Sequence, residues 1–113
     1  PEAHVDVVYV VPIPLLDETQ MANFKDILDM MISDGEDLLA EAEQKMGEDV
    51  AARTDSLLLT GTNPATEIVK LIGQRDYDLL IVGNRGLSGL KEYMGSVSHK
   101  LLHASPIPVL IAK

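Results

Sequence analysis

The stretch Val82-Gly83-Asn84-Arg85-Gly86 decides the fold of this chain, together with Gly95-Ser96-Val97-Ser98 a short insert later. It follows the apolar run Leu79-Leu80-Ile81, and a helical pattern closes the segment, so we predict a buried strand, a glycine-rich loop and a helix over residues 96–104. Glycines let backbone N–H groups approach a phosphate closely, and a helix N-terminus adds unpaired donors. The pattern therefore favours a nucleotide phosphate as the ligand of this loop.

Composition narrows the class of protein. The 113 residues predict a single domain over 1–113. The 18 acidic and 9 basic side chains give a net charge of −9, which argues against nucleic-acid and membrane partners. The chain has no cysteine, which excludes disulfides and thiolate metal sites. With no apolar run near the roughly 20 residues of a membrane span, we predict a soluble, cytoplasmic protein.

Strand and helix patterns alternate along the chain. We predict strands at 4–11, 56–60, 78–82 and 109–112. We predict helices within 17–50, with a break or a new start at Ser33-Asp34-Gly35, and from Asn63-Pro64 onward, where Asn63 caps the helix. The strands are uniformly apolar, which is typical of a parallel sheet covered on both faces. The predicted fold is α/β, an open, mainly parallel twisted sheet with helices on both faces.

These residues together resemble the universal stress protein family, in its nucleotide-binding branch. The resemblance is carried by Gly83-x-x-Gly86, by Gly95-Ser96 after a spacer, and by Pro108-Val109-Leu110-Ile111, and Gly61-x-x-Pro64 is similar to the family's entry into its third helix. The family spaces its second and third glycines by nine residues, whereas eight stand here. The family also begins with a central strand that carries an aspartate, followed by a helix. We expect this strand to be missing from the sequence or supplied by another segment.

The resemblance implies which residues bind the cofactor. It implies ATP, or ADP or AMP, with or without Mg²⁺. Val10, Pro12 and Val82 would lie near the base and ribose, and the loop and helix start would line the ribose and phosphates. The implied cofactor-binding residues are Val10, Pro12, Val82, Gly83, Asn84, Arg85, Gly86, Gly95, Ser96, Val97 and Ser98. Ser96 and Ser98 also suit a purely structural role as helix N-caps.

The sequence contains no recognisable catalytic group and no recognisable metal site. It has no nucleophile elbow and no lysine of the Walker A type, so we predict no catalytic residues and no enzyme, while leaving slow ATP hydrolysis open. His99 and His103 have the spacing of two metal ligands on a helix, but no third ligand accompanies them, and we predict an exposed flank instead.

We therefore predict a stress-response protein that binds an adenine nucleotide and signals through occupancy. The family implies a homodimer formed through the edge strand Val109-Leu110-Ile111-Ala112. One alternative is a nucleotide-free dimerisation or scaffold module of the same fold. A weaker alternative is a slow ATP-hydrolysing enzyme.

Overall fold

The computed structural model describes residues 3–83 and 91–112, and for 91–96 it describes the backbone alone. The chain divides into two compact units, residues 1–62 and 63–113, and each is described by itself. The prediction of one domain stays a prediction. Every strand pair found in the described residues is parallel, β1 with β2 and β3 with β4, so the predicted parallel pairing is confirmed. The described strands form two two-stranded sheets, one in each unit.

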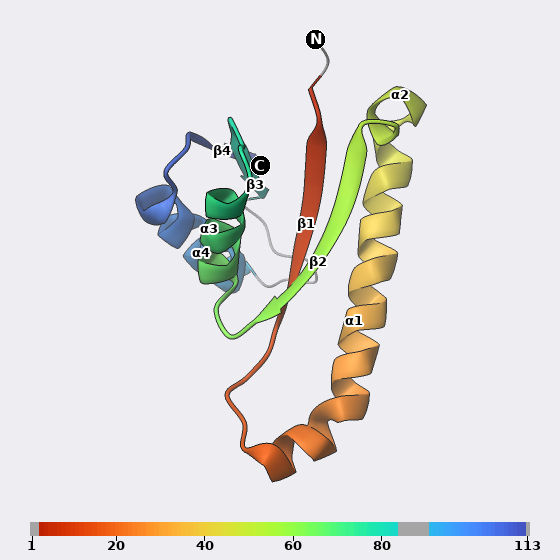
Figure 1. Ribbon diagram of the computed structural model, residues 1–113, viewed down its shortest axis with the longest axis vertical. Helices are drawn as coiled ribbons and strands as arrows, with labels where there is room; N and C mark the ends of the chain where they lie inside the picture. Colours follow the sequence, from red (N-terminus) through yellow and green to blue (C-terminus); the bar gives the residue numbers. More distant parts are fainter. Residues whose placement is uncertain (1–2, 84–90, 113) are drawn as a thin grey trace. The chain divides into compact units, whose positions relative to one another are not determined.

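The first unit is a two-stranded parallel sheet with a long helix against it (Figure 1). β1 spans Val5–Pro12 and β2 spans Thr54–Gly61, and the long helix α1 spans Glu18–Met46 between them, followed by the single turn α2, Glu48–Ala51. A parallel pair needs such a crossover, because the chain must return to the same end of the sheet. The sheet starts two residues earlier on β2 than predicted, at Thr54 instead of Ser56.

The long helix is uninterrupted, so the predicted break at Ser33-Asp34-Gly35 is wrong. Its start is a capping box, in which Asp17 and Gln20 each bond the other's backbone N–H, at 2.7 and 3.0 Å. Gly35 is buried on the face that meets the sheet, where an added Cβ would lie 2.7–2.9 Å from Leu58 and Tyr9. The glycine therefore serves close packing of helix on sheet, and the helix ends only at Gly47, whose φ is +82°.

The second unit contains α3 (Pro64–Gln74), β3 (Leu80–Gly83), α4 (Lys91–Ala104) and β4 (Val109–Ala112). Asn63 caps α3 by accepting a bond from the Thr66 N–H at 3.3 Å, which confirms the predicted cap. The bounds of β4 match the prediction, and β3 begins two residues later and ends one residue later than predicted. The core is formed by buried apolar side chains from both helices and β3: Ala65, Val82, Val97 and Leu101.

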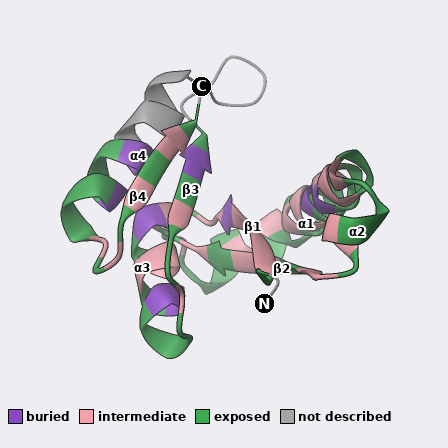
Figure 2. Ribbon diagram, turned by 90° about the horizontal axis from the view of Figure 1, so that it is seen from above, coloured by how far each residue is buried: buried purple, intermediate pink, exposed green. Residues whose placement is uncertain are grey.

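The sheet of the second unit has one covered and one open face. Side chains alternate across a strand, so Leu80 and Val82 face the helices, and Ile81 faces the other way. Ile81 pairs in register with Leu110, and these two residues are 62% and 53% exposed. Figure 2 shows that both β3 and β4 carry exposed stretches. Within this unit the described helices pack on one face of the sheet only.

Candidate functional site

The carboxyl end of β3 carries the first residues of the predicted phosphate loop. Val82 is 8% exposed and belongs to the core, so its side chain anchors the strand. Gly83 follows as the last residue of β3 and is itself exposed. In parallel α/β sheets, ligands bind beyond the carboxyl ends of strands, which is where Gly83 lies. The next predicted residues, Asn84, Arg85 and Gly86, lie outside the described residues.

Ser98 holds this strand end against the following helix. Its hydroxyl donates a hydrogen bond to the Gly83 carbonyl at 3.2 Å, and the residue is 6% exposed. A buried hydroxyl without a partner is costly, so this bond satisfies Ser98 and fixes the direction of the backbone at Gly83. Gly83 is the one residue of the predicted loop 83–86 that the structure describes, and it is exposed.

The helix after the loop begins earlier than predicted. α4 starts at Lys91 instead of Ser96, so Gly95, Ser96 and Ser98 are inside the helix and the interpretation of the two serines as N-caps is wrong. Lys91, Glu92 and Met94 are good helix formers, and a single internal glycine costs only about 1 kcal/mol. The backbone N–H groups of Gly95 and Ser96 are therefore inside the helix, and the unpaired donors belong to its first turn.

Two predicted residues, Val10 and Pro12, belong to the first unit. They lie at the carboxyl end of β1, where Val10 pairs with Leu59 and Pro12 with Gly61. The pairing continues one residue further, because the Ile13 N–H donates to the Gly61 carbonyl at 2.8 Å. Proline lacks an N–H and suits a strand end. Both residues are half-buried, and each unit thus contributes its own strand end to the predicted set.

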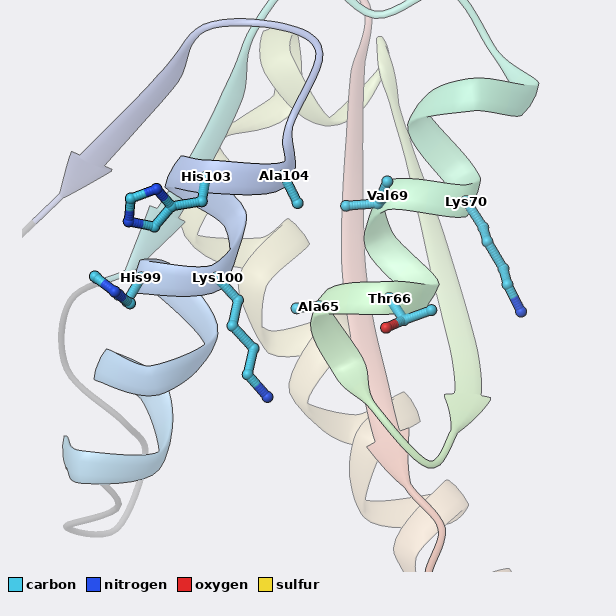
Figure 3. Close-up of a pocket in the computed structure, with 8 residues that line it drawn as sticks. All are labelled: Ala65, Thr66, Val69, Lys70, His99, Lys100, His103 and Ala104. Atoms are coloured by element: carbon cyan, nitrogen blue, oxygen red, sulfur yellow. The ribbon is translucent and has the colours of Figure 1, made fainter.

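A groove between α3 and α4 was not predicted from the sequence. It has a volume of about 470 Å³, and its lining includes the small or apolar side chains of Ala65, Val69 and Ala104 (Figure 3). Its polar groups come from Thr66, Lys70, His99, Lys100 and His103. The centroids of the two histidine rings are 4.7 Å apart, and the rings meet edge to face. Both histidines are exposed, as predicted. The Lys70 Nζ lies 3.6 Å from a carboxylate oxygen of Glu67, which offsets its charge. Lys100 and the two histidines are the other basic side chains that line the groove.

A second group that sequence reasoning missed lies in the first unit. His4 Nε2 is 3.0 Å from a carboxylate oxygen of Asp6 and 3.0 Å from one of Asp55. The alternation His4-x-Asp6 could have signalled two side chains on one face of a strand. Asp55 could be added only once the register of β1 and β2 was known.

Comparison with known proteins identifies the family. The model of the universal stress protein family matches residues 1–113. The chain belongs to the universal stress protein family. It is 40% identical over 81 residues to universal stress protein YxiE of Bacillus subtilis, a match that covers 71% of this chain and 53% of YxiE. It is 28% identical over 114 residues to universal stress protein MJ0531 of Methanocaldococcus jannaschii, covering 99% of this chain and 66% of that protein.

A solved structure of a family member has the same fold. The universal stress protein UspA from Lactobacillus plantarum superimposes with a TM-score of 0.83 at 18% identity, covering 98% of this chain and 78% of UspA. The predicted α/β fold class is therefore confirmed. The chain spans about half the length of YxiE. Within the described residues, no helix is both long and apolar enough to cross a membrane.

Proposed function

We propose that this chain binds an adenine nucleotide, ATP or its products ADP and AMP, and acts in a stress response through the occupied state. Membership of the universal stress protein family supports the stress-response role. The observation that carries the nucleotide is the exposed Gly83 at the carboxyl end of parallel β3, ahead of Gly86 and helix α4. Nucleotide that binds only the folded loop stabilises it, and partners then meet a different surface.

The site as proposed uses backbone groups more than side chains. Gly83 offers a backbone without a Cβ, and Ser98 already holds its carbonyl at 3.2 Å, which leaves the outward side for a ligand. Mg²⁺ would accompany the phosphates, and Arg85 would supply positive charge close to them. We propose no catalytic residue and no enzymatic turnover as the main activity. Steady phosphate release above background would instead favour the slow ATP-hydrolysing alternative.

Analysis of the purified protein tests the proposal directly. The protein is denatured, and any released nucleotide is identified by chromatography and mass. We expect ATP, ADP or AMP in near-stoichiometric amount, or a thermal shift with millimolar ATP if the purified protein is empty. An empty protein without a thermal shift would contradict the proposal and favour the nucleotide-free scaffold.

Substitution of Gly83 tests the position of the phosphates. We expect Gly83→Val to weaken ATP binding by at least about tenfold, because a branched side chain occupies the space that a phosphate needs. Valine is a good strand residue, so β3 should still form. Gly73→Ala, in an open part of α3, is the control and should leave the affinity unchanged. Wild-type affinity in a folded Gly83→Val protein would show that the phosphates lie elsewhere.

We also propose a homodimer through the edge of β4. Among the described strands, β4 pairs only with β3, and its Leu110 is 53% exposed. An apolar edge strand without a partner tends to associate. We expect light scattering to give a dimer at micromolar concentration. Leu110→Glu should give a monomer, because the dimer would bring two glutamate carboxylates, one from each copy, close together. Leu102→Glu, which is equally exposed on α4, should remain a dimer. A monomeric wild-type protein would contradict this proposal.

The pairing of the described strands is relevant to the first strand of the family, which we expect to be missing from this sequence or supplied by another segment. In the described residues β1 pairs only with β2, and β3 only with β4. The family resemblance implies a further strand beside each pair, and we infer that a segment outside residues 1–113, or another chain, supplies it. Each strand edge left without a partner inside a core would cost about 1–3 kcal/mol per buried group.

A further inference from the structure

Three metal-ligating side chains converge at the amino-terminal end of the sheet in the first unit. His4 Nε2 lies 3.0 Å from Asp6 Oδ1 and 3.0 Å from Asp55 Oδ2. One ligand atom from each of the three side chains lies within 4.8 Å of the other two. The phosphate loop follows the carboxyl end of a strand in the other unit, so this cluster is separate from the proposed nucleotide site in the chain and in its chemistry.

The strand register brings the three side chains together. His4 immediately precedes β1 and Asp6 is its second residue, so their side chains leave the same face of the strand. Asp55 pairs with Asp6 across the parallel sheet, and paired residues share a face. Tyr9 and Leu58 contact α1 at Gly35, and both are an odd number of positions from the aspartate on their own strand. The cluster therefore lies on the face opposite α1.

The backbone around His4 is fixed by Arg53. The Arg53 Nη1 donates to the Ala3 carbonyl at 2.8 Å, and the Val5 N–H donates to the Arg53 carbonyl at 2.9 Å. Residues on both sides of His4 are thus tied to the start of β2, two residues from Asp55. Ligands that are held before the ion arrives lose little freedom when it binds, as in other metal sites with ordered surroundings.

We propose that His4, Asp6 and Asp55 bind a divalent transition-metal ion, with Zn²⁺ or Mn²⁺ as the class that fits. One imidazole nitrogen and two carboxylates form a mixed donor set that these ions accept, with water completing the coordination. Two ligands in adjacent positions, each about 2.0–2.2 Å from a metal, are separated by about 3 Å, which is the spacing that His4 keeps from both carboxylates.

The charge and burial of the cluster favour a cation. The Asp6 side chain is only 4% exposed, whereas His4 and Asp55 are 58% and 65% exposed. Asp6 is held by its contacts with neighbouring residues, so its position should change little when an ion binds. A divalent ion would neutralise both carboxylates at once. It could enter from solvent beside His4 and Asp55, which are exposed. Binding would tie the starts of β1 and β2 together and stabilise the folded state by linkage.

Zn²⁺ titration by calorimetry, with Co²⁺ as a spectroscopic probe, tests the site on the full chain in phosphate-free buffer. We expect one tight equivalent of Zn²⁺ and a Co²⁺ visible spectrum that shows nitrogen and oxygen ligands. Asp55→Asn should weaken binding by at least about tenfold while leaving the circular dichroism spectrum unchanged, because this side chain is mostly exposed. His4→Gln should have the same effect.

His103→Gln is the matched control, because His99 and His103 are the chain's other two histidines. It should keep the wild-type affinity. Loss of the tight equivalent in His103→Gln alone would overturn the proposal and place the ion in the groove between α3 and α4. Equal Zn²⁺ binding by wild type and Asp55→Asn would also overturn the proposal. Metal held by a co-purified nucleotide would give this result. Absence of any tight binding would leave the cluster as an ion pair only.

Discussion

Leu101→Ala is expected to lower the free energy of unfolding by about 2–5 kcal/mol. Leu101 is fully buried on α4 and lies in the core cluster with Ala65, Val82 and Val97. Truncation removes three carbon atoms from the centre of the second unit and leaves a cavity that its neighbours fill only partly. Because small domains are stable by only about 5–15 kcal/mol, this loss should appear as a large fall in the urea midpoint.

The neighbouring residue provides the control for this experiment. Leu102 is 53% exposed on the same helix, so Leu102→Ala changes the same side chain where little burial is lost. We expect it to stay within about 0.5 kcal/mol of wild type, as surface substitutions usually do. Similar losses from the two substitutions would mean that α4 does not present Leu101 to the core.

The same substitution should also weaken nucleotide binding if the proposed site is correct. Leu101 is one turn after Val97 and Ser98, and Ser98 holds the Gly83 carbonyl. Packing of α4 thus sets the backbone that the phosphates would meet. ATP titration at a temperature where Leu101→Ala is folded should give a higher Kd than for wild type. Added ATP should still raise the thermal unfolding midpoint of the variant, because a ligand of the folded state shifts the equilibrium toward it.

Local sequence signals predicted the elements whose ends are set locally. The Asn63-Pro64 start of α3 was correct, because a side-chain cap and a proline at the first turn act within a few residues. β4 was correct at both ends, since prolines precede a short apolar run. β1 ends at Pro12, one residue later than predicted, and the Ile13 N–H still donates to the Gly61 carbonyl beyond the proline.

The errors arose where a distant contact overrides a local preference. Glycine next to serine and aspartate usually marks a helix end, but at Gly35 it makes room for Tyr9 and Leu58, which are 26 and 23 positions away in the sequence. Ser96 and Ser98 suit helix N-caps, and this pattern predicts a start of α4 at Ser96. One of those serines, Ser98, instead bonds Gly83, 15 residues before it.

Within the candidate sites, position in the chain again decided what could be predicted. Gly83 follows an apolar run, so its place at a strand end was visible in the sequence. The His4, Asp6 and Asp55 cluster was not visible, because 51 positions separate His4 from Asp55 and only the strand register brings them together. The groove between α3 and α4 likewise depends on how two helices pack.

Gly35→Ala is expected to destabilise the first unit although alanine is the better helix residue. An alanine Cβ would lie 2.8–2.9 Å from the Tyr9 ring and 2.7 Å from Leu58 Cδ1, closer than carbon atoms approach. Overpacking of this kind costs about 1–3 kcal/mol, and the gain in helix propensity returns about 1 kcal/mol. We therefore expect a net loss of up to about 2 kcal/mol, and a greater loss for Gly35→Val, both measured by urea unfolding.

Gly73→Ala separates the contact from the propensity. Gly73 also lies inside a helix, α3, but an added Cβ there meets nothing within 4 Å. This substitution should gain up to about 1 kcal/mol, because the backbone loses less freedom on folding and no neighbour is displaced. Changes in unfolding free energy of opposite sign at Gly35 and Gly73 would show that α1 packs close to β1 and β2 because Gly35 has no side chain. A gain at both positions would instead mean that α1 lies farther from the sheet, and that the Ser33-Asp34-Gly35 segment tolerates a side chain.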